Sequence, residues 1–475
     1  MDIRTQVLTG LRWTAGTRLL AQGFTWLVTI VVIRILTPED YGLLAIATLF
    51  TGFLSMLSEA GLGSAVVQAK ELDDVALRKV FGFVLVINLV LCLILVLGAP
   101  LIAWLFEEER LILMIQALAL SFLLVGFTAM PEALLDRRLA FKKRALVDLS
   151  SSVFGSALTL ALAAGRMGVW ALVLGTIGTA LWRAVGLQWL APFLKRPILS
   201  FDGLGGILGF GRNIVFSRLL WYFFSQIDVL IAGKLLGKEL LGIYSVSMHL
   251  ASLPAQKLGA ITYRVSFPAF AKLQGEAERT RMVFLQMIRI TSFWAFPVLW
   301  GISSVSPDIV HLFLGPRWDD AAPLLALLCL FMPLRILSPV VYSAIDGLGR
   351  PDIGVRNMLV ASIIMPIAFI VGCNWGLMGL ALSWVLVFPL VFIENMSRLL
   401  PVVHIKLKEF LATMARPIVG SAVMYAVVAI TREMVRVGPV PEMAVLILAG
   451  ILAYGIFTLL LNRPVLEEML ALVRH

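Results

Sequence analysis

The run VFGFVLVINLVLCLILVLGAPL, at residues 80–101, decides the fold of this chain. It contains no charged residue, and its polarity does not alternate with period two as a barrel strand's would. About 20 apolar residues suit a helix that crosses a hydrocarbon core of about 30 Å. The run therefore predicts a transmembrane α-helix.

Similar runs recur along the whole sequence. The chain has 475 residues, of which 60% are hydrophobic and 14% charged, and its mean hydropathy is +0.96. A soluble domain has about 25% charged residues. The composition therefore predicts an all-α polytopic membrane protein, with about fourteen transmembrane helices.

A repeat at an offset of 200 residues organises these spans. Identical residues at this offset are Arg12 and Arg212, Arg18 and Arg218, Phe24 and Phe224, Leu36 and Leu236, Glu39 and Glu239, and Gly42 and Gly242. An even number of spans separates the copies, which gives both the same orientation. This parallel repeat predicts two six-helix lobes, 1–200 and 201–400, with a substrate site between them. Residues 401–475 would add two helices and a cytoplasmic tail.

Basic residues predict the orientation. With the N-terminus inside, the inner connections hold 27 lysines and arginines and the outer ones 8, while the remaining four lie within spans. This bias places both termini in the cytoplasm. It also accounts for the net charge of +10 without nucleic acid as a partner.

Signs of an enzyme are missing from the sequence. It has no Walker loop, no His/Cys cluster and no paired carboxylates in an aqueous domain. Its cysteines, Cys92, Cys329 and Cys373, lie in apolar runs and suit core packing. The longest inner connection, about 261–286, and the longest outer one, about 306–321, are too short for a soluble domain. We therefore expect transport within the membrane, with no catalytic residue, metal or cofactor.

Charged residues within spans are the candidate site. Such charges cost about 2.5–3.5 kcal/mol each at a helix centre, so each needs an explanation. On a wheel with 100° per residue, Arg18, Gln22 and Thr25 share an arc of about 60° in the first span. The seventh span repeats the pattern over about 80°, with Arg218, Trp221, Ser225 and Asp228.

These two stripes, together with Arg335 in the tenth span, would line a cationic cavity and bind the substrate. Alternatively, Arg18 and Arg218 snorkel to the lipid headgroups. The alternative for Arg335 is a buried pair with a carboxylate of a neighbouring helix.

Three further titratable residues lie in spans. Asp228 and Glu59 are candidates for ion coupling. A structural hydrogen bond is an equal alternative for Glu59, which lies near a helix end. His249 in the eighth span suits packing better than a proton relay.

Four stretches resemble a known family: RILTPEDYGLLA at 34–45, EAGLGSAVVQ at 59–68, DVLIAGKLLGKELLGIY at 228–244 and RVSFPAFAKLQ at 264–274. Together they are similar to the polysaccharide transporter family, the Wzx-type flippases of the multidrug/oligosaccharidyl-lipid/polysaccharide flippase superfamily. The resemblance covers essentially the whole chain in span number and repeat.

The resemblance implies a function in the bacterial inner membrane. Such a flippase moves an undecaprenyl-pyrophosphate-linked oligosaccharide to the periplasmic leaflet by alternating access, while the prenyl tail stays among membrane lipids. Arginine forks suit the pyrophosphate oxygens. We expect a monomer, with a polysaccharide polymerase and chain-length machinery as candidate partners.

Other functions are less well supported by the sequence. The main alternative is a cation-coupled small-molecule exporter of the same fold, but the first span lacks the acidic residues that such relatives often carry. A membrane glycosyltransferase or ligase would need a larger outer loop. A scaffold of envelope assembly would not need the charged stripes.

Overall fold

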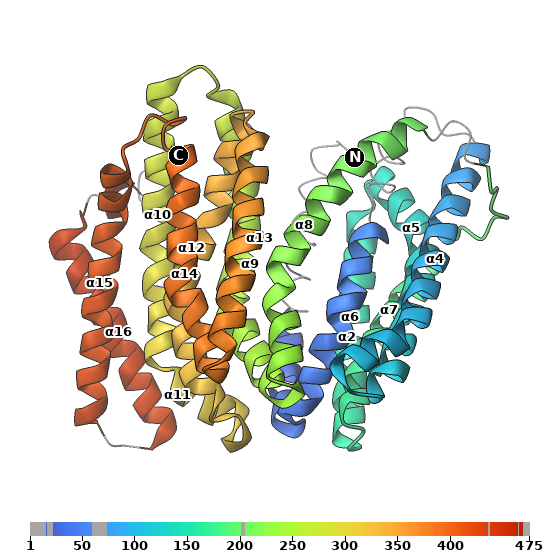
Figure 1. Cartoon of the computed structure of the whole chain (residues 1–475), viewed down its shortest axis with the longest axis horizontal. Helices are drawn as coiled ribbons and strands as arrows, with labels where there is room; N and C mark the ends of the chain where they lie inside the picture. Colours follow the sequence, from blue (N-terminus) through green and yellow to red (C-terminus); the bar gives the residue numbers. More distant parts are fainter. Residues whose placement is uncertain are drawn as a thin grey trace. The chain divides into compact units, whose positions relative to one another are not determined.

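The computed structural model describes residue 16 and residues 22–58, 74–200, 205–435, 438–463 and 465–468. Within these ranges the side chains at 205–218, 257, 258, 260 and 261 are not described. All regular elements in the described part of the chain are helices (Figure 1). The all-α prediction is confirmed.

The helices follow one another with short connections. In chain order they are Gln22–Ile35, α2 (Pro38–Ser58), α4 (Asp74–Phe106), α5 (Arg110–Arg137), α6 (Phe141–Ala164), α7 (Val169–Leu190), α8 (Gly205–Leu235), α9 (Lys238–Lys272), α10 (Ala277–Ser304), α11 (Ser306–Ile309), η1 (Val310–Leu314), η2 (Pro316–Trp318), α12 (Ala321–Gly347), α13 (Pro351–Cys373), α14 (Gly376–Leu399), α15 (Leu407–Met434) and α16 (Pro439–Leu461).

Eleven of the described helices are long and apolar enough to cross a membrane, and Gln22–Ile35 is a shorter apolar helix. With α8 and α9, which have 31 and 35 residues, the helices in the described part of the chain are consistent with about fourteen spans. Polar residues in the middle of α9, such as His249 and Gln256, lower its hydropathy.

The longest predicted connections are largely helical. The inner one shrinks because α9 continues to Lys272 and α10 begins at Ala277. The outer one contains the short helices α11, η1 and η2. Neither leaves room for a soluble domain.

The chain divides into two compact units, Met1–Gly242 and Ile243–His475. The lobe boundaries at 200 and 400 stay a prediction from the repeat. In unit 1, α6 packs on α7, α4 on α5, and α5 on α7. Small residues bring α6 and α7 together: a Cβ on Gly155 would lie 1.6 Å from Thr179 Oγ1, and one on Gly175 would lie 1.8 Å from Thr159 Oγ1.

A second close approach joins α2 to the first turn of α9, which belongs to unit 1. A Cβ on Gly42 would lie 1.7 Å from the Lys238 carbonyl oxygen, and one on Gly242 would lie 1.7 Å from the Pro38 carbonyl oxygen. Residues 38 and 238, and 42 and 242, are equivalent under the repeat. The contact is therefore reciprocal, as in a two-fold symmetric interface.

Ion pairs surround this crossing. Lys238 binds Glu39 at 2.9 Å and also binds Glu108, which lies between α4 and α5. Arg110 binds Glu108 at 2.7 Å and also contacts Glu39. The hydrogen bonds from Arg110 and then Lys238 hold the pKa of the Glu108 carboxyl at about 2, below its ordinary value of 4.5. The starts of α2 and α9 are thus tied to the α4–α5 connection.

Unit 2 is built around α12, which contacts α10, α13 and α14. Its core includes Phe284, Ile288, Val340 and Phe410, all fully buried. The last two helices, α15 and α16, pair with each other, and α15 also packs against α10. α12 is the most buried of the eleven spans, so a polar residue on it must find partners within the unit.

Candidate functional site

Several predicted site residues cannot be placed. Arg18 and Glu59 lie outside the described residues, and Arg218 belongs to the part of α8 whose side chains are not described. A common cavity for Arg18, Arg218 and Arg335 therefore stays a prediction.

Thr25, a predicted site residue of the first helix, contacts a neighbouring helix of unit 1. The Ser156 hydroxyl on α6 donates to Thr25 Oγ1 at 3.4 Å. Gln22 is half-buried. Thr25 therefore helps to join the first helix to α6.

The stripe predicted on α8 has mixed surroundings. Trp221 is 50% exposed, whereas Asp228 is 2% exposed and accepts a hydrogen bond from the Val229 amide at 2.9 Å. Ser225 donates to the Tyr222 carbonyl at 3.0 Å. Within this stripe, Trp221 is open to its surroundings and Asp228 is enclosed by protein.

Tyr222 explains how this part of α8 is held. Its hydroxyl donates to the Leu49 carbonyl on α2 at 2.8 Å, and its ring packs on Gly52, where a Cβ would lie 2.3 Å from the hydroxyl oxygen. α8 is therefore anchored on α2 next to the exposed Trp221.

Arg335 lies half-buried on α12 among aromatic residues of unit 2. Its guanidinium lies 5.2 Å from the centre of the Trp384 ring, and Nη1 lies 4.0 Å from Met248 Sδ on α9. A cation over an indole face gains about 0.5–2 kcal/mol. The guanidinium thus has an aromatic environment on at least one side.

Trp384 on α14 is itself held rigidly. It is fully buried, its ring stacks on Phe331 at 4.9 Å and 11°, and its Nε1 donates to the Tyr244 hydroxyl at 2.8 Å. A fixed ring presents a fixed surface to Arg335. The guanidinium is therefore oriented by α14 as well as by its own helix.

Polar side chains follow Met248, the α9 residue that contacts Arg335, along the sequence of α9. The side chain of His249 on α9 is exposed. Ser252 donates to the His249 carbonyl at 2.9 Å, and Gln256 Nε2 donates to the Ser252 hydroxyl at 2.8 Å. The spacing of three and four residues along one helix face was a signal for this group in the sequence.

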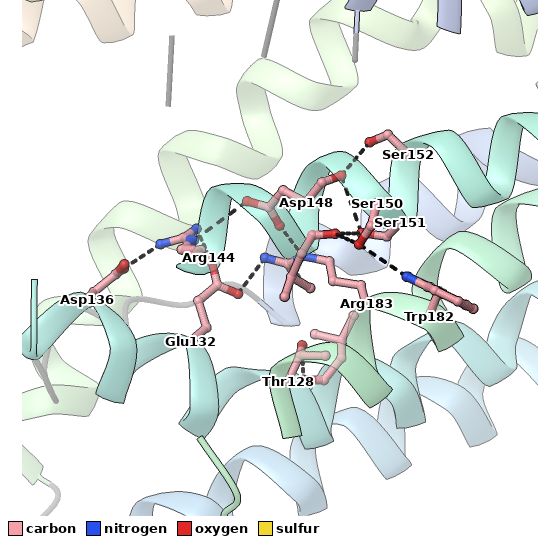
Figure 2. A network of polar contacts seen from close by, with 12 residues as sticks. Thr128, Glu132, Asp136, Arg144, Asp148, Ser150, Ser151, Ser152, Trp182 and Arg183 are labelled. Carbon is pink, nitrogen blue, oxygen red and sulfur yellow. Dashed lines mark hydrogen bonds and ion pairs between the residues drawn. The ribbon is translucent and has the colours of Figure 1, made fainter. Parts of the chain in front are cut away.

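A charged network in unit 1 was missed by sequence reasoning (Figure 2). Arg144 on α6 binds Glu132 and Asp136 of α5, the latter at 2.5 Å. Arg183 on α7 binds Glu132 at 2.8 Å and Asp148 at 3.0 Å. The two guanidinium groups therefore lie between three carboxylates from α5 and α6.

This network ties three helices together. Trp182, next to Arg183, donates from Nε1 to the Ser150 hydroxyl at 3.2 Å and stacks on Phe154 at 4.4 Å (Figure 2 labels Trp182 and Ser150). Because Arg144 and Arg183 already bind carboxylates, they are poorly suited to hold an anionic ligand. We interpret the network as structural: it holds α5, α6 and α7 together.

Known proteins resemble this chain over most of its length. Residues 31–323 match the family model described as "Polysaccharide biosynthesis protein". The lipopolysaccharide biosynthesis protein WzxC of Escherichia coli is 26% identical over 390 residues, which are 82% of this chain and 79% of that protein. The succinoglycan biosynthesis transport protein ExoT of Rhizobium meliloti is 25% identical over 471 residues, 97% of this chain and 94% of its own.

A solved structure shares the fold. The lipid II flippase MurJ in an inward closed conformation superposes with a TM-score of 0.73 at 16% identity, covering 94% of this chain and 99% of that one. Together with the family match, this confirms the resemblance that the four sequence stretches predicted. The chain is a member of the polysaccharide biosynthesis protein family and has the fold of the lipid II flippase.

Proposed function

We propose that this protein moves an undecaprenyl-pyrophosphate-linked oligosaccharide from the cytoplasmic to the periplasmic leaflet for surface-polysaccharide synthesis. The family and the transport and biosynthesis names of WzxC and ExoT support this role. The observation that carries it here is Arg335, a cation in the middle of a membrane-spanning helix that is positioned by Trp384.

The chemistry of Arg335 suits this substrate. A pyrophosphate is anionic and offers several oxygens in a geometry that a guanidinium fork matches. Such a charged hydrogen bond is stronger in a low-dielectric site than in water. The polar face of α9, with His249, Ser252 and Gln256, would hydrate or bind the glycan, while the prenyl tail stays in lipid.

The protein would act in the bacterial inner membrane with both termini in the cytoplasm. The 27 to 8 distribution of basic residues supports this orientation. Alternating access would expose the site first to the cytoplasm and then to the periplasm. A polysaccharide polymerase would use the product on the far side.

Flipping in proteoliposomes tests the role of Arg335. The probe is the pyrophosphate-linked repeat unit extracted from source cells, and the readout is its transfer between leaflets. Arg335→Ala should slow transfer by about tenfold or more, because a charged hydrogen bond contributes about 1.5–3 kcal/mol. The transfer rate of Arg335→Lys should lie between those of the wild type and Arg335→Ala, since lysine keeps the charge but loses the forked geometry of the guanidinium.

Arg183→Lys is the matched control. Arg183 also lies in a span, but its guanidinium binds Glu132 and Asp148, so the change should lower thermal stability more than transfer rate. Transfer at the wild-type rate by Arg335→Ala would contradict the role of that residue. Failure of the wild type to move any pyrophosphate-linked glycan would contradict the function itself.

A further inference from the structure

Two exposed aromatic rings lie near the C-terminal end of α9. The Tyr263 and Phe267 rings are nearly parallel, with centroids 5.9 Å apart and an angle of 10° between their planes. The residues are 37% and 38% exposed. One turn of helix separates them, so the rings form a single aromatic surface on that face.

A carboxylate borders this surface. The Tyr263 hydroxyl donates to Asp346 Oδ2 at 2.8 Å, and Asp346 is exposed near the end of α12. The bond orients the carboxylate beside the tyrosine ring. Asp346 can therefore accept a further hydrogen bond from a hydroxyl placed over the rings.

The two helix ends that carry these groups are held firmly together. A Cβ on Gly347 would lie 2.7 Å from Phe270 Cβ, so only glycine permits this approach of α12 to α9. Gln274 Nε2 also donates to the Gly347 carbonyl at 2.6 Å. The aromatic surface and the carboxylate are thus pre-positioned, which lowers the cost of binding.

Their depth in the membrane follows from the length of α9. Tyr263 lies 25 residues after Lys238, a helical rise of about 37 Å along a path that includes Pro254, and this rise exceeds a hydrocarbon core of about 30 Å. In the proposed orientation Lys238 is periplasmic, so Tyr263 reaches the cytoplasmic interface. Arg264 and Arg350 lie in the neighbouring sequence, as expected for that side.

An aromatic face with one carboxylate matches a pyranose. The ring of a sugar has an apolar face of C–H groups and a rim of hydroxyl donors. Small-molecule sites combine such apolar area with a few fixed polar groups. Tyrosine and phenylalanine also occur as plain interfacial anchors, but a carboxylate beside them is unfavourable next to anionic lipid headgroups.

The same face of α9 leads into the membrane. At 100° per residue, Tyr263, Gln256 and His249 fall within an arc of about 40°. A glycan that leaves the aromatic surface would next meet the polar side chains Gln256, Ser252 and His249. These lead along α9 to Met248, which contacts Arg335.

We propose that Tyr263, Phe267 and Asp346 form a glycan-loading platform, which receives a sugar of the lipid-linked oligosaccharide at the cytoplasmic face. The platform rests on the proposed function and orientation. It selects the glycan, whereas Arg335 binds the pyrophosphate whatever sugar is attached.

Measuring the binding of two lipids in nanodiscs separates the contribution of the platform from that of Arg335. The probes are the pyrophosphate-linked repeat unit from source cells and undecaprenyl pyrophosphate without sugar. The wild type should bind the glycosylated lipid more tightly. Asp346→Asn should weaken its binding by about tenfold, the value of one charged hydrogen bond. Phe267→Ala should also weaken it, because the change removes apolar contact area for the sugar ring. Both variants should leave the affinity for the bare lipid unchanged.

Tyr263→Phe keeps the ring and removes only the bond to Asp346, so it should fold normally and lose less glycan affinity than Tyr263→Ala. Trp375→Ala removes another strongly exposed aromatic residue of unit 2, 70% exposed, and should change neither affinity. Equal losses for both lipids, or no loss for either, would overturn the platform. If the wild type bound neither lipid, the proposed function would fail and the platform with it.

Discussion

Arg335 and Arg183 place guanidinium groups in membrane-spanning helices, and their contacts differ in kind. Arg183 lies against Glu132 and Asp148, so its charge is matched within unit 1. Arg335 lies over the fixed ring of Trp384. Pairing with carboxylates favours stability, whereas contact with an aromatic ring orients the guanidinium of Arg335.

Asp228 is the residue on which we predict ion coupling. It is a carboxylate that is only 2% exposed within α8, and buried titratable groups are candidates for a functional role. Asp228→Asn has the same shape but cannot titrate. It should abolish transport that depends on a pH gradient while thermal unfolding shows a folded protein.

Glu433→Gln provides the control, because Glu433 is an exposed carboxylate at the end of α15. It should retain gradient-driven transport. Undiminished gradient-driven transport by Asp228→Asn would leave Asp228 with a packing role only.

Sequence reasoning identified the residues that are costly by themselves, but not those whose role depends on partners. Arg335 was found because a charge within a span is expensive wherever it points. Glu132, Asp136 and Asp148 were missed because their partners come from other helices. Tyr263 was missed for the same reason, since its meaning depends on Asp346, 83 residues away.

The crossing of α2 and α9 is an element contact that should be highly sensitive to substitution. A methyl group at Gly42 would overlap the Lys238 carbonyl, a backbone atom that cannot rotate away. Gly42→Ala should therefore lower the free energy of unfolding by about 1–3 kcal/mol or prevent folding. Thermal unfolding of the purified protein in detergent measures this loss.

Gly98→Ala is the matched control on α4. A Cβ there meets nothing within 4 Å, and alanine is favoured over glycine within a helix by about 1 kcal/mol. It should leave stability unchanged or raise it slightly. A Gly42→Ala protein as stable as the wild type would show that the helices separate at no cost and that the crossing is not a fixed joint.

Helix positions were predictable because each span must be apolar, but helix ends were less so. The sequence predicts a connection at about 261–286, since hydropathy falls there. Hydropathy reports contact with lipid, whereas a helix continues as long as its backbone hydrogen bonds are made. α9 therefore extends to Lys272 and carries Tyr263 and Phe267 beyond the apolar segment.

For the whole molecule, composition and charge distribution predict the fold class and the membrane orientation better than any single residue does. The hydrophobic fraction of 60% excludes a soluble fold, and the basic residues are distributed unequally between alternate connections. These are sums over many positions and tolerate errors in individual spans. Which helices pack against each other depends on particular residues and cannot be read from composition. The family was therefore indicated by the four sequence motifs.

The proposed orientation predicts the side of the membrane on which exposed connections lie. Arg138, exposed at the end of α5 within the basic segment 137–144, should be cytoplasmic, and Arg317, exposed between α11 and α12, should be periplasmic. In intact cells a membrane-impermeant maleimide should label Arg317→Cys and leave Arg138→Cys unlabelled until the cells are permeabilised. Because Cys92, Cys329 and Cys373 are buried, they should add little background. The opposite labelling would reverse the orientation and would place the Tyr263 platform on the periplasmic side, where it could not load a substrate made in the cytoplasm.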